Sequence, residues 1–290
     1  MSVVAIPRLK DYLELTKPRL TALVLATTAG GFWLGVRSAE ELGQLGPLLI
    51  GTALSAGGAQ ALNQWMERTQ DALMQRTQRR PLPSGRLHPA SAQRFGLLLL
   101  VVGIVSLTLA VNPLTGCLAA ISAASYLFLY TPMKRTTPLC TLVGAIPGAI
   151  PPMMGWAAAR GTVGPEAWVL FSVLFLWQLP HFLAIAVWYR DDYARADFKM
   201  LPLTEPDGHV AARQMVLYGL VLLPVSLLPA VMGMAGAWYF YGALTGSLVF
   251  LGVCARAAWR RSAQAARLLF RTSVLYLPVL LALLAWDKAP

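Results

Sequence analysis

The sequence predicts an all-α polytopic membrane protein that crosses the bilayer about nine times. Of its 290 residues, 57% are hydrophobic and only 13% are charged, whereas soluble domains carry roughly 25% charged residues. Apolar runs recur along the whole chain, and each is close to the roughly 20 residues that a helix needs to span a bilayer. Alternating strand patterns are absent, so helices are the expected spanning elements.

Nine apolar runs mark the predicted spans. Ahead of the first run, residues 8–17 are expected to form a short interfacial helix. A short connection, Asn112-Pro113, separates the third run from the fourth, and the acidic stretch 190–192 closes the sixth. The fifth run contains the Pro- and Gly-rich stretch 144–152, which should distort its helix and widen a cavity. In chain order, the predicted spans are 20–36, 45–66, 93–111, 114–131, 138–159, 166–189, 212–232, 236–255 and 268–286.

The net charge of +11 follows this topology. With nine spans, the N-terminus and four connections share one side, and 21 of the 24 Lys and Arg residues lie there. The other three, Arg37, Arg160 and Lys288, lie opposite. The asymmetry places the first side in the cytoplasm and the C-terminus on the far side. The basic excess thus reflects orientation and contact with anionic membrane lipid. Nucleic acid is not an expected partner, because no soluble basic and aromatic module exists.

The chain reads as a single integral-membrane domain, residues 1–290. It begins with an N-terminal cytoplasmic segment, 1–17, that has neither a cleavable signal nor a long Arg- and Ser-rich presequence. A bacterial inner membrane is therefore the expected location. The longest polar connections are 67–92 and 190–211, both on the cytoplasmic side.

Asn63, Glu67 and Asp71 form the first candidate cluster, at the end of the second predicted span. A spacing of four residues places them on one helix face. Their oxygen atoms suit Mg2+, which commonly binds one or two carboxylates together with substrate phosphate and water. The alternative is a solvated helix end with i,i+4 pairs to Arg68 and Arg76.

Asp191 and Asp192 form a second acidic cluster at the cytoplasmic end of the sixth span. Adjacent carboxylates repel each other unless a cation compensates them. Two such ends on one membrane face predict a metal–phosphate site, and an enzyme acting on a phosphorylated lipid.

Basic residues on the same side are candidates for holding the phosphate. Positive-inside anchoring explains each of them singly just as well. The candidates are Arg19, Arg76, Arg80, Lys134 and Arg135.

His181 lies inside the sixth span, directly after Pro180. An intramembrane histidine beside a proline is a candidate for function. The alternative is a buried histidine hydrogen-bonded to a neighbouring helix.

Together these stretches resemble the UbiA-type intramembrane prenyltransferases, and within them the haem-modifying branch. The resemblance covers about residues 10–210 in the expected order. The superfamily usually has Asp where this chain has Glu67, and its second acidic motif is often spaced Asp-x3-Asp, where this chain has Trp188 four residues before Asp192. The matching stretches are Thr16-Lys-Pro-Arg19, Asn63-x3-Glu67-x3-Asp71-x4-Arg76-Thr-x2-Arg-Pro81-Leu-Pro, Tyr130-Thr-Pro-x-Lys134-Arg135, Trp177-Gln-x-Pro-His181-Phe and Asp191-Asp-Tyr193-x6-Met200-Leu-Pro202.

The resemblance implies a helical fold around a central cavity and Mg2+-dependent transfer of a farnesyl group from farnesyl diphosphate to a vinyl group of haem b, with water added. It implies metal–diphosphate ligands at Asn63, Glu67, Asp71, Asp191 and Asp192. It also implies diphosphate contacts at Arg76, Lys134 and Arg135, and places His181 on the haem side. A haem-A-forming enzyme or a terminal oxidase would then receive the product.

Two alternatives remain open. Another aromatic or quinone prenyltransferase would share the acidic clusters without needing haem. A secondary transporter would suit the intramembrane polar residues and broken helices, although these acidic clusters lie at the cytoplasmic edge.

Overall fold

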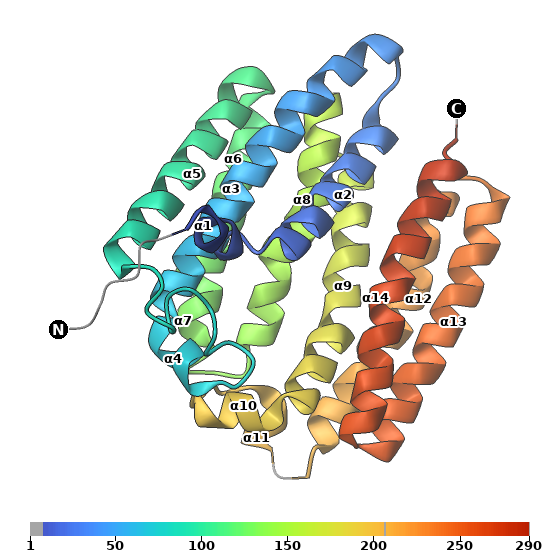
Figure 1. Ribbon diagram of the computed structural model, residues 1–290. Helices are drawn as coiled ribbons and strands as arrows, with labels where there is room; N and C mark the ends of the chain where they lie inside the picture. The colour runs from blue at the N-terminus through green and yellow to red at the C-terminus, as the bar shows by residue number, and fades with distance from the viewer. Residues whose placement is uncertain (1–7, 206, 290) are drawn as a thin grey trace.

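The structure is a bundle of long helices that run up and down in chain order (Figure 1). The computed structural model describes residues 8–205 and 207–289, and these residues contain no β-strand. The long helices are α2 (Pro18–Gly35), α3 (Leu45–Met66), α5 (Pro89–Ala110), α6 (Pro113–Ala124), α8 (Cys140–Arg160), α9 (Pro165–Trp188), α12 (His209–Val231), α13 (Ala237–Arg260) and α14 (Ala263–Trp286).

Eight helical segments in the described part of the chain are long and apolar enough to cross a membrane. This confirms the predicted all-α, multi-pass class. The first predicted span is α2, which lies in the same bundle but falls outside the eight. Its 18 residues include three threonines and three glycines, which dilute its hydropathy. The eight are Ala39–Met66, Pro89–Ala110, Pro113–Met133, Cys140–Arg160, Pro165–Trp188, His209–Val231, Ala237–Arg260 and Ala263–Trp286.

Glycines bring α2 close to α8. A Cβ added at Gly31 would lie 1.9 Å from the Pro152 carbonyl oxygen, and one at Gly155 would lie 2.0 Å from the Thr28 carbonyl oxygen. Neither position has room for a side chain. Small residues at such crossings let membrane helices gain van der Waals contact, because lipid offers little hydrophobic drive between them.

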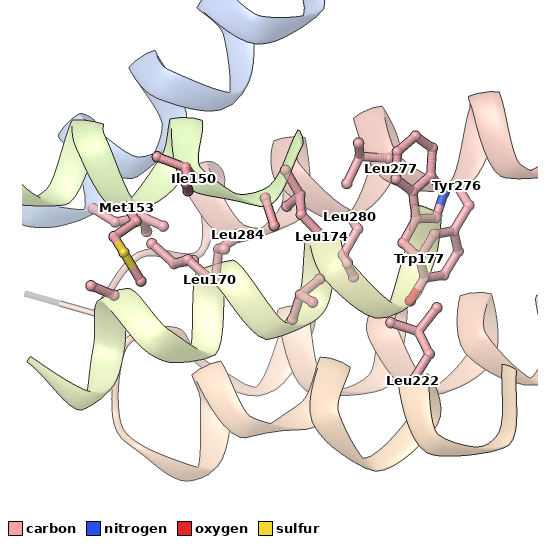
Figure 2. Packing of buried hydrophobic residues seen from close by; sticks show 14 of the residues in the cluster. Ile150, Met153, Leu170, Leu174, Trp177, Leu222, Tyr276, Leu277, Leu280 and Leu284 are labelled. Atoms are coloured by element: carbon pink, nitrogen blue, oxygen red, sulfur yellow. The ribbon is translucent and has the colours of Figure 1, made fainter. Parts of the chain in front are cut away.

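The main apolar core lies where α9 packs against α8, α12 and α14. Figure 2 shows Leu174 and Trp177 of α9 beside Leu277 and Leu280 of α14. The Trp177 Nε1–H donates a hydrogen bond of 2.9 Å to the Ser273 carbonyl oxygen of α14. This satisfies the indole donor inside the core, where an unpaired polar group is costly.

Short helices gather at one end of the bundle, the lower end in Figure 1. They belong to the two long connections predicted from the sequence and to the residues before α8. The backbone N–H of Gln75 donates to the Asp192 carboxylate at 2.9 Å, so the two connections lie against each other. The short helices there are α4 (Arg68–Leu73), α7 (Thr131–Met133), α10 (Arg190–Arg195) and α11 (Leu201–Thr204).

Helix α1 (Leu9–Leu15) occupies most of the expected interfacial segment. Its Leu9 and Leu13 side chains are exposed, and they share one face because they are four residues apart. Arg86 ties α1 to the connection before α5 through ion pairs with Asp11 and with Glu14, the latter at 2.9 Å. Of the predicted segment 1–17, residues 1–7 lie outside the described part.

The fourth predicted span is not a plain α-helix. It consists of α6, a π-helical turn η2 (Ser125–Tyr130) and α7. Pro132 has no N–H to donate back into the preceding turn. The backbone N–H of Thr131 donates to the Tyr126 carbonyl oxygen, and the Thr131 hydroxyl donates to the same oxygen at 2.8 Å. Such π-helical turns are frequent at functional sites.

The prolines expected to distort the fifth span lie inside α8, which stays continuous. Because Pro151 lacks an N–H, the carbonyl oxygen of Pro147 has no helical donor. The Ser122 hydroxyl of α6 donates to that oxygen at 3.1 Å. A neighbouring helix therefore satisfies the freed backbone group, as membrane helices with prolines require.

Candidate functional site

A cavity of about 410 Å³ opens between α2, α3, α6, α8 and α9 and contains the first predicted cluster. Its wall at the end with the short helices carries charged residues, among them Glu67, Asp71 and Lys134. Its wall deeper in the bundle is mostly apolar, with Leu23, Val24 and Met154 among the lining residues. The cavity therefore offers a polar end and an apolar end to one elongated ligand.

Asn63 stands at the centre of the polar end and is almost fully buried. Its Nδ2 donates to Glu67 Oε2 at 3.0 Å and to Thr131 Oγ1 at 3.1 Å. Its Oδ1 accepts a hydrogen bond of 3.1 Å from Lys17 Nζ. The last turn of α3, the turn before α2 and the start of α7 therefore meet at one amide.

Lys134 and Glu67 form a buried ion pair. The Lys134 Nζ lies 2.7 Å and 2.9 Å from the two Glu67 carboxylate oxygens. Burial lowers the pKa of the Lys134 ammonium, but the charge and hydrogen bond of Glu67 act together with nearby Tyr126 and Tyr193 to raise it, and the net shift is upward. Lys134 therefore stays charged inside the cavity wall.

Lys17 has a different environment, because its only described polar partner in the cavity is the neutral Asn63 amide. Burial, together with the nearby charges of Arg80 and Lys134, lowers the pKa of the Lys17 ammonium to about 7. An anion at this end of the cavity would favour its charged form.

Asp71 is buried, and its Oδ2 lies 2.8 Å from an Arg80 guanidinium nitrogen. Arg76 also lines the cavity, although its side chain is largely exposed. The Arg76 guanidinium lies over the Tyr189 ring, 5.0 Å from its centroid, and 5.9 Å from that of Tyr193. Arg76 and Arg80 are thus placed at the polar end as the sequence predicts.

Two predicted phosphate contacts do not reach the cavity. Arg19 and Arg135 are exposed, and neither lines it. Their neighbours Lys17 and Lys134 do so instead. The reason is local, because each residue of a helix turns the side-chain direction by roughly 100°. Lys134 and Arg135 are one residue apart and Lys17 and Arg19 are two apart, so only one basic residue of each pair faces inward.

The second acidic cluster does not point into the cavity either. Asp191 is exposed. Asp192 is buried, but its carboxylate accepts from the backbone N–H groups of Gln75 at 2.9 Å and Arg76 at 3.4 Å, and pairs with Arg195. The two acidic ends, which the sequence leads us to expect around a pair of metal ions, therefore do not share one cavity wall in the described residues. Instead, Asp192 holds the loop that carries Arg76.

Replacing Asp192 by Ala should loosen that loop. Hydrogen bonds to a charged acceptor contribute about 1.5–3 kcal/mol, so amide exchange at Gln75 and Arg76 is expected to speed up about ten-fold or more. Hydrogen–deuterium exchange of the purified protein measures this directly. Asp191→Ala is the matched control and should leave exchange at residues 75–76 unchanged. Equal exchange in wild type and the Asp192 variant would contradict the assignment.

His181 lines the deeper wall, between the rings of Trp177 and Phe270, each 5.1 Å away between centroids. Its Nδ1 lies 2.7 Å from Ser273 Oγ. The Ser273 hydroxyl donates its one hydrogen to the Phe270 carbonyl oxygen at 2.6 Å, so it can only accept from Nδ1–H. This leaves a lone pair on Nε2 of the neutral ring, the form in which histidine binds metals.

Several cavity residues are absent from the sequence-based set. Lys17 is one of them, because the sequence-based set names Arg19, two residues later, as the phosphate contact. Tyr126, Tyr130 and Gln178 also line the cavity. The two tyrosines face it through the π-helical turn, which no simple periodicity indicates. Gln178 lies three residues before His181, so its place on the same helix face is the signal that could have identified it.

Asn63, Glu67 and Asp71 offer one amide and two carboxylate groups to the same cavity. Among the described residues, no three His, Cys, Asp or Glu side chains form a metal-binding group. The oxygen donors do fit Mg2+ that completes its coordination with phosphate and water.

Comparisons with known proteins agree with this geometry. A family model described as the UbiA prenyltransferase family matches residues 24–280. A protein of Solibacter usitatus (strain Ellin6076), named protoheme IX farnesyltransferase, is 50% identical over 289 residues and spans 97% of this chain and 99% of the relative.

Solved structures share the fold at low sequence identity. A structure of digeranylgeranylglyceryl phosphate synthase has a TM-score of 0.81 at 16% identity, covering 96% of this chain and 98% of that one. A UbiA homologue from Archaeoglobus fulgidus, bound to GPP and Mg2+, has a TM-score of 0.68 at 16% identity, covering 94% and 99%.

Proposed function

The chain belongs to the UbiA prenyltransferase family and is a prenyltransferase, and on that premise we propose that it makes haem O. In this reaction a farnesyl group passes from farnesyl diphosphate to a vinyl group of haem b, and water is added. The observation that carries the proposal is one cavity with a cationic, carboxylate-lined end and a long apolar end. The full-length likeness to a protein named protoheme IX farnesyltransferase supports the choice of substrates.

The diphosphate is proposed to bind at the polar end. Lys17, Lys134, Arg76 and Arg80 line this end, and their hydrogen-bond donors can neutralise the charge that grows on the leaving group. Preorganised donors of this kind act strongly where water is excluded. Because Lys134 and Arg80 pair with carboxylates in the described structure, diphosphate binding would exchange those partners.

Asn63, Glu67 and Asp71 are the residues proposed to hold Mg2+. The metal supplies Lewis-acid stabilisation of the departing diphosphate. The structure of a homologue bound to GPP and Mg2+ supports the use of this metal. Asp191 and Asp192, also expected as ligands from the sequence, lie outside the cavity wall, and we assign the positioning of the Arg76 loop to Asp192.

The apolar end is proposed to receive the farnesyl chain and the haem. Its side chains keep bulk water from the allylic cation, which would otherwise be captured before the vinyl group attacks. His181 lines this end, and its Nε2 lone pair is suited to coordinate the haem iron.

His181→Ala should therefore weaken haem binding. The expected change is a shift of the Soret band and a fall in affinity of about ten-fold, as for a lost polar contact near 1.4 kcal/mol. Titration of detergent-purified protein with haem b measures both. Trp168→Ala, an exposed aromatic change on the same helix, is the control. A spectrum and affinity equal to wild type would remove His181 from the haem site.

The function is tested by incubating purified protein with farnesyl diphosphate and Mg2+, with and without haem b. Diphosphate release that requires haem b, with a product heavier than haem b by a farnesyl and a hydroxyl group, is the expected result. Removal of Mg2+ by EDTA should stop release, and added Mg2+ should restore it. Release with a quinone precursor but not haem would identify another prenyltransferase. No release with any acceptor would favour a transporter.

The same proposal fixes the setting. The enzyme would lie in a bacterial inner membrane with the polar end of its cavity toward the cytoplasm, as the charge distribution predicts. Its product would pass to a haem-A-forming enzyme or a terminal oxidase.

A further inference from the structure

Gln178 carries an oxygen that no described residue uses. It lies on α9, three residues before His181, is 5% exposed and lines the cavity. Its Nε2 donates to the Leu174 carbonyl oxygen at 3.0 Å and approaches the Ala145 carbonyl oxygen at 3.4 Å. Since both partners are carbonyls, which only accept, the amide orientation is fixed. Gln178 Oε1 is left as an acceptor with no donor in residues 8–205 and 207–289.

Gly148 of α8 makes room for this oxygen. A Cβ at Gly148 would lie 2.0 Å from Gln178 Oε1, so any larger residue would displace the amide. One residue earlier in the chain, the Pro147 carbonyl oxygen accepts the hydroxyl hydrogen of Ser122 at 3.1 Å. Ser122 and Gln178 thus reach successive residues of α8, Pro147 and Gly148. Ser122, Gly148 and Gln178 all line the cavity.

This cluster offers acceptors and no free donors to the cavity. The Ser122 hydroxyl already donates its single hydrogen to the Pro147 carbonyl oxygen, so its own oxygen can only accept a further hydrogen bond. Gln178 Oε1 is an amide oxygen and can also only accept. The matching ligand has two hydrogens to donate and is small. Water fits both conditions, and a buried water typically needs two to four polar partners. A purely structural role, linking α8 to α9, accounts for the hydrogen bonds of the Gln178 amide nitrogen. It does not account for the amide oxygen, which has no donor among the described residues.

Resting on the proposed function, we infer that Gln178 and Ser122 bind the water molecule that is added to the haem vinyl group. A water that donates both hydrogens to these oxygens keeps its lone pairs free for attack. The two side chains act as positioning residues for the nucleophile. Neither is basic enough to remove its proton.

The step balances without an oxidant or reductant. The carbon–oxygen bond of farnesyl diphosphate breaks, and its electron pair leaves with the diphosphate. The vinyl π pair forms a carbon–carbon bond to the farnesyl carbon, leaving a cation on the vinyl carbon next to the macrocycle. The water lone pair forms a carbon–oxygen bond there, and the surplus proton ends on the released diphosphate. Without a held water, the same cation would lose a proton and give an alkene lighter by one water.

The test separates hydration from transfer. Gln178→Met and Ser122→Ala are assayed with farnesyl diphosphate, Mg2+ and haem b, and products are resolved by mass. Both variants should still transfer farnesyl, and the ratio of anhydrous to hydrated product should rise about ten-fold or more over wild type. If Gln178→Met does not accumulate as folded protein, the product ratio of Ser122→Ala, which removes only one oxygen atom, is the deciding measurement.

A wild-type product ratio in either folded variant would overturn the assignment. Wild-type protein that forms no haem adduct of any mass would overturn the proposed function instead. Gln64→Met is the matched control. This buried glutamine lies one turn from Gln60 on α3 but does not line the cavity, and its variant should keep the wild-type ratio.

Discussion

Asp71→Asn is expected to reduce kcat/KM for farnesyl transfer by about 100-fold or more, the range seen when one preorganised charge-stabilising group is removed. Asp71 is buried on the cavity wall, and its carboxylate pairs with Arg80 at 2.8 Å. The amide removes one charge that the proposed Mg2+ requires and leaves the Arg80 guanidinium uncompensated. Steady-state kinetics at several Mg2+ concentrations should show the loss persisting when Mg2+ saturates the wild type.

The control for Asp71 is Asp197→Asn. Asp197 carries a carboxylate at the same end of the bundle, but it is highly exposed and pairs only with Lys199 in the described structure. Exposed ion pairs contribute little to stability, so this variant should keep activity within about two-fold of wild type. If Asp71→Asn retained full Mg2+-dependent activity while Asp197→Asn did not, the proposed ligand set would be wrong.

Lys134→Met should have the second large effect, on both activity and stability. Lys134 holds both oxygens of the buried Glu67 carboxylate. Removing one partner of a buried pair costs about 3–5 kcal/mol, because the remaining charge is left unpaired. We also expect kcat/KM for farnesyl diphosphate to fall by about 100-fold, because a charged donor to the leaving group is lost. Thermal unfolding in detergent and steady-state kinetics measure the two effects separately.

A double variant distinguishes a phosphate role from mere destabilisation. Adding Glu67→Gln to Lys134→Met removes the unpaired charge, so thermal stability should recover much of the loss, while the affinity for farnesyl diphosphate measured without Mg2+ should stay low. Binding is the readout because Glu67 is itself a proposed Mg2+ ligand, so its loss lowers turnover in any case. Arg135→Met is the matched single control, since Arg135 is the next residue but is exposed and lies off the cavity. Recovery of that affinity together with stability in the double variant would exclude Lys134 from diphosphate binding.

The long helices were predictable because their signal is additive over some twenty residues. The apolar run that forms α9, for example, remains strongly apolar when its predicted ends are shifted by a few residues. α2 shows the limit. Its glycines and threonines weaken hydropathy, yet they serve its close contact with α8 at Gly31 and Gly155. The composition of α2 suits its packing against α8, and hydropathy along the sequence does not show which helix will be its neighbour.

The site was predictable where helical periodicity alone sets direction. Asn63, Glu67 and Asp71 follow each other at steps of four, and all three line the cavity as expected. Prediction failed at helix ends. There the choice between Lys17 and Arg19, or between Lys134 and Arg135, depends on how the chain turns. Nor could the direction of Asp191 and Asp192 be predicted, because α9 ends at Trp188 and both carboxylates lie on a separate short helix.

The π-helical turn at Ser125–Tyr130 amounts to one surplus residue in an otherwise α-helical span. An inserted residue turns everything after it by roughly 100° about the helix axis. Tyr130, the last residue of the turn, and Lys134, which comes after it, point into the cavity because of this rotation. The segment therefore has a fixed length: a single deletion would make the helix more regular and locally easier to form, yet would rotate Lys134 away from Glu67. At this point in the chain, the irregular helix is the one that places Lys134 beside Glu67, and a regular α-helix would separate them.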